Sequence, residues 1–414
     1  MKISMFHLMP HRELPADFEQ RYKSVWVDPP FPELADASRV GQYYNWTLDE
    51  LIHAAEAGLD GICVNEHHQN AYGFMPSPNL MGAILAKATN GMDVAIVQMG
   101  STLPTTSPAI RVAEEYAMID CISGGRLVAG MPLGTPMDAN MVYGVPPIEQ
   151  RDRYYEAHDL IIKAWTSQEM FAWNGTYQKL GMVNSWPRPI QTPHPPVWVP
   201  GSGSLSTWDF SAKHDHCYCF LSYFGNRLGK KVMDGFWEFV DRSELDPNPH
   251  RAGFLQLVAV GDTDAQAEKD YAEHIKYFYS KCLHIPATYL GVPGHQDYRS
   301  LEYGIRSGNS ARTMQTLANL KQMTLKDFID DQFVICGSPA TVRDQLQGAI
   351  ENLRVGNLMV LLHIGSMPYE LTLKNIDLFA HEVLPHLRDN WSEWENRWWP
   401  QSLRHQRQLV GATG

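Results

Sequence analysis

Eight short apolar runs, each followed by a longer segment with helical spacing, constrain the fold of this 414-residue chain more than any other feature. Alternating strand and helix patterns indicate parallel strands joined by right-handed crossovers. Eight such units in one large domain predict a closed (β/α)8 barrel; an open doubly wound sheet is the structural alternative. The predicted strands cover residues 2–8, 61–64, 93–100, 126–132, 195–201, 216–222, 252–261 and 357–365.

Two segments depart from the repeating pattern. Residues 281–323 lie between the seventh and eighth predicted strands and are expected to form an insertion over the barrel mouth. Residues 389–414 form a tryptophan-rich tail on an otherwise polar background, which favours packing on a neighbouring surface over ligand binding. The barrel domain is therefore assigned to residues 1–388 and the tail to residues 389–414.

The bulk composition excludes several classes of protein. The chain has 34 basic and 46 acidic residues, a formal charge of −12, which argues against a general nucleic-acid binder. No stretch approaches the roughly 20 apolar residues of a membrane span, and the N-terminus lacks a signal-length apolar run. Six cysteines without a C-x-x-C pair indicate reduced thiols. The expectation is a cytoplasmic protein that binds neither nucleic acid nor membrane.

The stretch VNEHHQNAYG, from Val64 to Gly73, follows the second predicted strand. It has three readings: a metal site, an acid/base site or the polar end of a strand. Neighbouring strand residues point to opposite sides, so Glu66 and His68 face one way and His67 the other. Three consecutive strand residues therefore do not chelate one ion, and no metal site is predicted. A histidine at a strand's carboxyl end suits proton transfer near neutral pH.

The stretch VPGSGSLSTWDF places two glycines and several hydroxyls between the fifth predicted strand and a helix. Free N–H groups and a partial positive charge make a helix N-terminus suitable for an anion such as phosphate. The pattern is neither a P-loop nor G-x-G-x-x-G. By itself it fits a capped, flexible turn equally well.

Four stretches carry a family resemblance: GLDGICVNEHHQNAYG, AEEYAMIDCISGGRLVAG, WPRPIQTPHPPVWVPGSGSLST and LFAHEVLPHL. In this order they resemble the bacterial luciferase-like flavin-dependent monooxygenases, over residue 1 to about 388. Within that family the chain is similar to the limonene monooxygenase-like and alkanal monooxygenase-like branch.

The resemblance implies a (β/α)8 barrel of the luciferase-like type that binds reduced FMN and O2. It implies oxygenation of a small organic substrate through a flavin C4a-hydroperoxide, with reduced flavin supplied by a separate NAD(P)H:flavin reductase. His67 occupies the position of the catalytic acid/base histidine, and Gly203, Ser204 and Thr207 match the turn around the FMN phosphate. Family members pair as homodimers, so a homodimer is expected.

One position departs from the family pattern. Luciferases place an arginine that pairs with the FMN phosphate just after the fourth strand, where this chain has Pro132 and Leu133. Arg151 and Arg153, at the start of the next helix, are candidates to replace it, and Arg153 is assigned to cofactor binding here. The alternative role for both is that of solvated helix charges.

Further residues follow the predicted strands at the same end of the barrel. Gln98 and Ser101 are expected to meet the edge of the isoalloxazine ring. The expected substrate pocket consists of His7, Asn70, Tyr72, Tyr223 and His363, with core packing as the alternative for each.

Two other functions are compatible with the same motifs. One is a dehydrogenase or reductase of this fold that uses the deazaflavin F420, and the other is a non-catalytic flavin-binding protein. The substrate stays open among aldehydes, alkanes, terpenes, sulfonates and N-heterocycles.

Overall fold

The structure, a computed structural model, describes residues 1–403. Eight parallel strands form a closed barrel in which each strand pairs with the next and the last pairs with the first. The predicted (β/α)8 barrel is thereby confirmed, and the open sheet is not formed. The strands are β1 (Lys2–Phe6), β2 (Gly61–Val64), β3 (Ala95–Gln98), β4 (Leu127–Gly130), β7 (Val197–Gly201), β8 (Cys217–Phe220), β9 (Ala252–Val260) and β11 (Asn357–Leu361).

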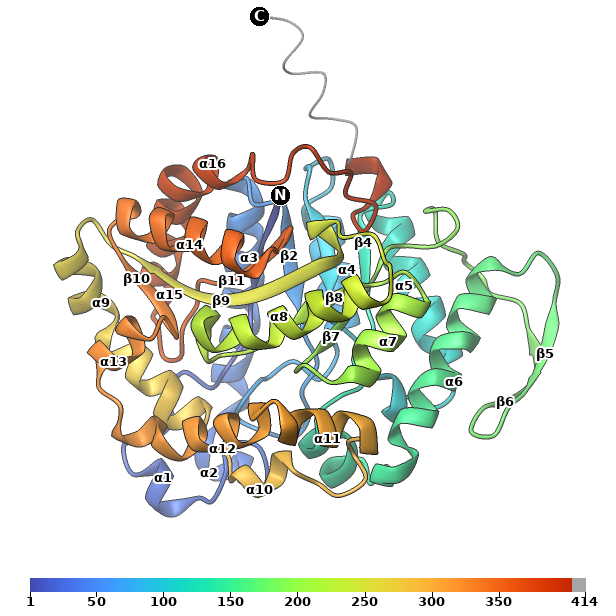
Figure 1. Cartoon of the computed structure of the whole chain (residues 1–414), viewed down its shortest axis with the longest axis horizontal. Helices are drawn as coiled ribbons and strands as arrows, with labels where there is room; N and C mark the ends of the chain where they lie inside the picture. Colours follow the sequence, from blue (N-terminus) through green and yellow to red (C-terminus); the bar gives the residue numbers. More distant parts are fainter. Residues whose placement is uncertain (404–414) are drawn as a thin grey trace, which may run out of the picture.

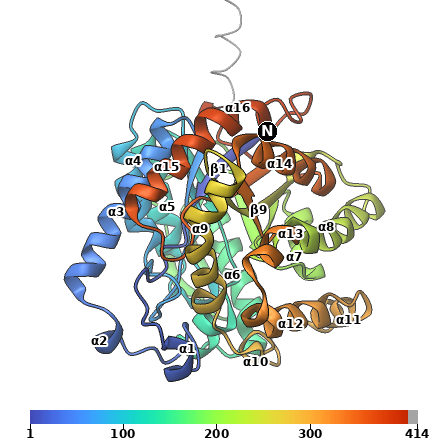
Figure 2. The same cartoon turned by 90° about the vertical axis from the view of Figure 1, so that its left-hand side faces the viewer.

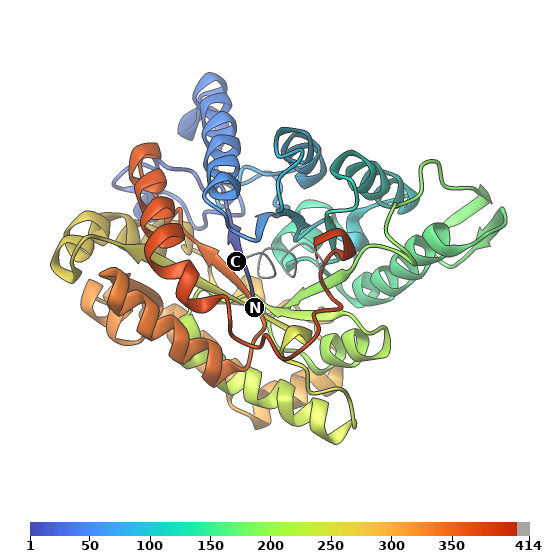
Figure 3. The same ribbon diagram turned by 90° about the horizontal axis from the view of Figure 1, so that it is seen from above.

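Helices surround the barrel (Figure 3). The buried apolar residues form two clusters, one between the strands and the surrounding helices and one that includes the barrel interior. Side chains alternate along each strand, so Ile62 and Val64 of β2 pack outward on helices while Cys63 faces the interior. The surrounding helices are α3 (Ala37–Glu56), α4 (Pro78–Ala88), α5 (Ile110–Ser123), α6 (Pro147–Thr166), α7 (Leu205–Lys213), α8 (Gly225–Arg242), α9 (Asp264–Tyr277), α14 (Pro339–Leu353) and α15 (Tyr369–Leu378).

We call the end at the carboxyl ends of the barrel strands the mouth and the opposite end the base. Short helices α1 (Phe18–Arg21) and α2 (Phe31–Leu34) lie at the mouth, at the bottom of Figure 1. The remaining short elements are α16 (Leu384–Leu387) and the helical turns η1 (Leu103–Thr105), η2 (Met137–Val142), η3 (Pro249–Arg251), η4 (Phe278–Cys282), η5 (Leu320–Gln322), η6 (Phe379–Val383) and η7 (Gln401–Leu403).

The predicted insertion between the last two barrel strands is helical and lies on the mouth side (Figure 2). It contains α10 (Ala287–Leu290), α11 (Tyr298–Arg306) and α12 (Asn309–Asn319), followed by α13 (Leu325–Asp330). Strand β10 (Val334–Gly337) then pairs in parallel with the carboxyl-terminal half of β9. The sequence analysis missed β10, and also the antiparallel hairpin of β5 (Phe171–Asn174) and β6 (Lys179–Val183), which projects as an arm in Figure 1.

The tail does not behave as expected. Its described part crosses the base of the barrel (Figure 3), where Trp398 and Trp399 are 2% and 1% exposed. Trp198 in the barrel donates its indole N–H to the Trp398 carbonyl over 2.9 Å. The expectation that these tryptophans pack on a neighbouring surface is therefore wrong, because they fill an apolar opening in their own barrel. Residues 404–414 of the predicted tail lie outside the described residues.

Within residues 1–403, no helix combines the length and apolar character needed to cross a membrane.

Candidate active site

His67 lies at the mouth, three residues beyond the end of β2. Its Nδ1 atom is 3.0 Å from Oδ2 of Asp138, and its ring meets Trp26 and Tyr72 edge-to-face at centroid distances of 4.8 and 4.7 Å. Nε2 of His67 has no hydrogen-bonding partner among residues 1–403. Because Asp138 holds Nδ1, Nε2 is the nitrogen that can exchange a proton with a molecule at the mouth.

The carboxylate of Asp138 is buried in η2, a single turn of π-helix. Its Oδ1 atom accepts hydrogen bonds from the Trp26 indole N–H and the His68 backbone N–H, both over 3.0 Å. Burial raises the pKa of Asp138, but the charge and hydrogen bond of His67, with the bonds from Trp26 and the backbone amide, outweigh it and leave this pKa below its ordinary value. Asp138 is thus a fixed, ionised acceptor that orients the imidazole of His67.

His68 points away from His67, as strand alternation predicts. Its Nδ1 atom lies 3.0 Å from the Tyr143 hydroxyl, and Nε2 lies 3.0 Å from Oε1 of Glu66. The same Glu66 oxygen accepts a hydrogen bond from the Thr102 backbone N–H over 3.0 Å. Both ring nitrogens of His68 therefore adjoin protein groups, whereas His67 leaves one facing the mouth.

Aromatic side chains form the wall beside His67. The rings of Trp26 and Tyr72 stack with their centroids 3.9 Å apart, and the Tyr72 hydroxyl donates to the Tyr223 hydroxyl over 2.9 Å. Tyr72 and Tyr223 thus lie together, as two members of the expected substrate pocket. Asn70 has a different role, because its side chain bonds the His68 carbonyl and the Gly73 amide and so holds the turn after His67.

His7 and His363 do not line the mouth as expected. Both are fully buried, and their rings stack 4.8 Å apart. Nε2 of His7 is 2.7 Å from Glu50 on α3, and Arg12 makes paired hydrogen bonds of 3.0 Å to the same carboxylate. These side chains neutralise a buried charge between the barrel and α3, so we leave both histidines out of the proposed pocket.

The structure places Gln98 and Ser101 behind the mouth. The amide of Gln98 lies against Gly82 of α4, where even an added Cβ would collide with it. Gln98 therefore points outward from β3, which does not agree with a position at the isoalloxazine edge. The Ser101 hydroxyl accepts from Asn79 over 3.1 Å, and its backbone N–H donates to Tyr116 over 2.9 Å. Ser101 supports the loop after β3.

The Gly/Ser turn joins β7 to α7 at the mouth. Gly203 has a φ of +96°, and a Cβ there would lie 2.6 Å from Val232, so a glycine is required. Ser204 is the N-cap of α7; its hydroxyl accepts from the Thr207 backbone N–H over 3.3 Å and lies 2.7 Å from the Thr207 hydroxyl. The predicted helix cap is present, and the polar atoms of the turn gather at the positive end of α7.

A carboxylate from the insertion lies beside this turn. Asp297 accepts hydrogen bonds from the hydroxyls of Ser206 and Ser300, the latter over 2.7 Å. Nε of Arg151 is 3.9 Å from the same carboxylate and, although this atom is buried, it has no hydrogen-bonding partner among residues 1–403. Burial raises the pKa of Asp297, but the bonds from Ser206 and Ser300, with the charge of Arg151, outweigh it and lower this pKa. The site beside α7 thus accommodates one negative charge.

Arg153 does not reach the Gly/Ser turn. It pairs with Glu149 one helical turn away over 2.8 Å, and its guanidinium lies over the ring of Tyr177, 4.7 Å from the centroid. The assignment of Arg153 to cofactor binding therefore does not agree with the structure. Helical geometry explains the difference, since residues two positions apart on α6 point in different directions; Arg151 faces the turn.

The sequence analysis missed three residues of this site: Trp26, Asp138 and Asp297. A local signal exists for one of them. The stretch TPMD has the S/T-x-x-D spacing of a helix start, and the Thr135 hydroxyl accepts the Asp138 backbone N–H over 3.2 Å. That spacing predicts a helical turn but gives no indication that its acid reaches His67. Trp26 lies in a loop without a comparable pattern, and Asp297 is the N-cap of α11, a local role that does not place it beside the Gly/Ser turn.

Known proteins resemble this chain over most of its length. The profile of the luciferase-like monooxygenase family matches residues 32–355. A 2,5-diketocamphane 1,2-monooxygenase of Pseudomonas putida is 23% identical over 376 residues, covering 84% of this chain and 94% of that protein. The oxygenase component of a flavin-dependent trigonelline monooxygenase from Acinetobacter baylyi is 29% identical over 168 residues, 40% of this chain and 45% of that protein.

Solved structures share the fold. The oxygenating constituent of 3,6-diketocamphane monooxygenase from Pseudomonas putida, in complex with FMN, superposes with a TM-score of 0.65 at 18% identity and covers 93% of this chain and 98% of that one. An F420-dependent secondary alcohol dehydrogenase superposes with a TM-score of 0.61 at 15% identity, covering 94% and 99%. At these identities the superpositions establish the barrel fold, which hosts both flavin and deazaflavin chemistry.

Proposed function

The chain belongs to the luciferase-like monooxygenase family, and from this premise we propose that it is the oxygenase component of a two-component flavin-dependent monooxygenase. It takes reduced FMN from an NAD(P)H:flavin reductase in the cytoplasm and uses O2 to oxygenate a small organic substrate. The observation that carries the proposal is the His67–Asp138 pair at the mouth, in which Nε2 of His67 has no hydrogen-bonding partner in the described part of the chain.

The Gly/Ser turn supports the binding of a flavin phosphate. The N-terminus of α7 and the hydroxyls of Ser204 and Thr207 supply donors, and Arg151 supplies a positive charge with an unpartnered Nε–H. Asp297 already places a carboxylate in this region, which indicates that the surroundings tolerate an anion. Because like charges repel, a bound phosphate and Asp297 compete for the same donors.

The residues at the mouth have separate tasks in this proposal. His67 holds or moves a proton at Nε2, and Asp138 keeps Nδ1 protonated and the ring in place. The stacked Trp26 and Tyr72 exclude water from one side of the imidazole. Reduced flavin, when bound, supplies the electrons that activate oxygen.

Two measurements test this function. The first follows O2 uptake and NADH consumption by the protein with a flavin reductase and FMN, with and without aldehydes, ketones, sulfonates and N-heterocycles. We expect one compound class to yield an oxygenated product whose new oxygen atom comes from labelled O2. Product formation with reduced F420 in the absence of O2 would assign the chain to the deazaflavin-dependent enzymes instead.

The second measurement is equilibrium binding. Anaerobic and aerobic fluorescence titrations are expected to give one reduced FMN per chain and weaker binding of oxidised FMN, because the proposed enzyme takes up reduced flavin and releases it oxidised. A preference for FAD, or binding of no flavin in either redox state, would contradict the proposal.

An apolar surface on α4 and α5 supports a homodimer. Leu80, Ile84, Met118 and Ile122 are between 40% and 69% exposed on these two helices, which pack against each other. Burial of this surface against a second copy removes apolar area from water. Light scattering is expected to give twice the chain mass of 46.9 kDa. The charged substitution Ile84→Glu is expected to yield monomers, and a monomeric wild-type protein would refute the dimer.

A further inference from the structure

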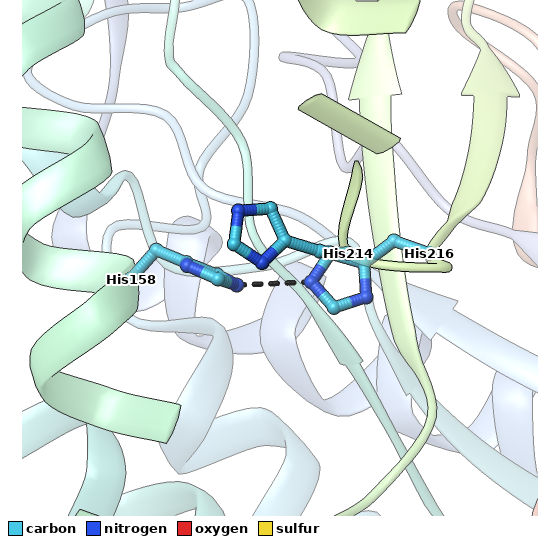
Figure 4. A group of neighbouring side chains, drawn as sticks. All are labelled: His158, His214 and His216. Carbon is cyan, nitrogen blue, oxygen red and sulfur yellow. Dashed lines mark hydrogen bonds between the residues drawn. The ribbon is translucent and has the colours of Figure 1, made fainter. Parts of the chain in front are cut away.

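Three histidines converge near the amino end of β8, at the base (Figure 4). His158 comes from α6, His214 follows the last residue of α7, and His216 precedes β8. Nε2 of His158 and Nε2 of His216 are 2.9 Å apart, and one ligand nitrogen from each of the three rings lies within 4.8 Å of the others. The flavin site proposed above uses none of these residues.

The ring nitrogens of this cluster are arranged as donors to a metal ion. Nδ1 of His158 lies 2.9 Å from the carboxylate of Asp159, so Nδ1–H donates to that carboxylate and the lone pair of Nε2 faces the cluster. An imidazole fixed by a carboxylate in this way is the usual arrangement of a metal-binding histidine. No carboxylate lies between His158 and His216 to pair with a shared proton.

The cluster lies in a largely buried setting, in which His158 and His216 are 1% and 4% exposed. Phe210 packs against His158 and His214 with centroid distances of 4.8 and 4.7 Å, and His214 is only partly buried, which leaves an entry path.

We propose that His158, His214 and His216 form a binding site for one divalent transition-metal ion of the zinc type. Zinc accepts three imidazoles at about 2.0–2.1 Å in a tetrahedral arrangement, which corresponds to nitrogens about 3.3 Å apart. The distance of 2.9 Å between the nitrogens of His158 and His216 is within a few tenths of an ångström of this spacing. The ligand nitrogen of His214 has to move toward them by at most about 1.5 Å to reach it. Water occupies the fourth position.

The bound ion has a structural task in this proposal. It links α6 to the segment between α7 and β8. The same segment anchors the tail, because Asp215 between the two histidines pairs with Arg397 and its carbonyl accepts the Trp398 indole N–H over 2.8 Å. Metal binding therefore stabilises the base of the barrel, and its loss leaves the mouth intact.

The test uses the full chain, produced without a polyhistidine tag and freed of metals with a chelator. Calorimetric titration with Zn²⁺ is expected to give one ion per chain, and Co²⁺ is expected to give the visible absorption of a tetrahedral site. Zn²⁺ is also expected to raise the melting temperature, because it binds only the folded chain.

Variants assign the ion to the cluster. His158→Gln and His216→Gln each remove one ligand and are expected to weaken Zn²⁺ binding more than the roughly 10- to 100-fold typical of losing a supporting residue. Asp159→Asn, which removes that support, is expected to fall within this range. His214→Gln changes the least buried of the three ligands. This variant tests the loss of Zn²⁺ binding if the variants of the two buried histidines do not fold.

His250 provides the matched control. It is a buried histidine at the same end of the barrel, outside the three-histidine cluster. His250→Gln is expected to keep one Zn²⁺ per chain with unchanged affinity. The proposal is overturned if the wild type binds no stoichiometric Zn²⁺ or Co²⁺, if the cluster variants bind as the wild type does, or if His250→Gln loses the ion to the same extent.

Discussion

The two ends of the barrel use similar residue types for different purposes. At the mouth, His67 is paired with the ionised Asp138, and among residues 1–403 its Nε2 has no hydrogen-bonding partner. At the base, His158 and His216 face each other, and Trp399 closes the barrel interior. The mouth therefore offers a polar atom for chemistry, while buried side chains of the chain itself fill the barrel interior at the base. This division follows the general rule that barrels of this kind place chemistry at the carboxyl ends of their strands and stability at the other end.

The comparison also shows what determines the behaviour of a histidine. A single carboxylate-bound imidazole suits proton transfer, whereas three imidazoles that converge suit a metal ion, although one of them, His158, is also bound to a carboxylate. The comparison leads to five predictions, in which changes at the mouth alter activity, cofactor binding or stability in acid and a change at the base alters the free energy of unfolding.

The largest effect is expected at His67. His67→Asn keeps much of the side-chain size but cannot exchange protons near neutral pH, so product formation is expected to fall by about 10²- to 10⁴-fold. Binding of reduced FMN is expected to stay close to the wild type, and the melting temperature is expected to fall modestly because Asp138 loses the charge and hydrogen bond of His67. Single-turnover product yield, flavin titration and thermal unfolding measure these three quantities.

His68→Asn is the matched control for this change. Because both ring nitrogens of His68 adjoin protein groups, the variant is expected to lose stability and only a small part of its activity. If His68→Asn abolished product formation while His67→Asn retained it, the roles assigned to the two histidines would be reversed.

The second effect is expected at the base. Trp399→Ala removes a buried indole and leaves a cavity, at a cost of about 3–5 kcal/mol in the free energy of unfolding. Denaturant unfolding measures this cost, and flavin affinity below the melting temperature should not change. Trp186, which is 80% exposed, is the control, and Trp186→Ala is expected to change stability by less than about 0.5 kcal/mol. A folded, stable Trp399→Ala protein without flavin affinity would show that the two ends are coupled.

The third effect distinguishes the roles of Arg151 and Arg153, two arginines of α6. Arg151→Gln removes a charge-assisted bond of about 1.5–3 kcal/mol to a phosphate and is expected to raise the dissociation constant of reduced FMN by about 10- to 100-fold. Arg153→Gln is expected to leave it unchanged, because Arg153 pairs with Glu149. Riboflavin, which lacks the phosphate, should bind both variants equally.

Asp297→Asn is expected to change the affinity for FMN in the opposite direction to Arg151→Gln. Asparagine keeps the N-cap of α11 but removes the negative charge beside Arg151. FMN is therefore expected to bind more tightly to this variant than to the wild type. Weaker binding would mean that Asp297 supports the phosphate site instead of competing with it.

The smallest effect is an acid dependence at the mouth. The pKa of Asp138 is lower in the folded chain than the value of about 3.9 expected after unfolding. Its contribution to stability is therefore present above about pH 4 and is lost as the pH falls through the folded pKa. Asp138→Asn should be less stable than the wild type at pH 7. The difference between the melting temperatures of the two proteins should become smaller below about pH 4.

The sequence by itself determined the barrel and the directions in which side chains point at the ends of its strands. All eight barrel strands lie within the predicted runs, because short apolar segments separated by helical patterns form parallel strands. Strand alternation placed His67 and His68 on opposite sides although the regular strand ends at Val64. The Gly/Ser pattern correctly predicted a capped turn, because Gly203 and Ser204 meet local backbone requirements. These features depend on neighbours within a few residues.

Only the tertiary structure decided which distant loops meet. Asp138 lies 71 residues from His67, and Asp297 lies 91 residues from Ser206. The absence of local ligand spacing led to the prediction of no metal site, yet His158 meets His216 across 58 residues. The same closure drew the tail tryptophans into the base. Periodicity fixes the direction of a side chain from its own strand or helix, whereas its partner depends on barrel closure and loop packing, which no local pattern encodes.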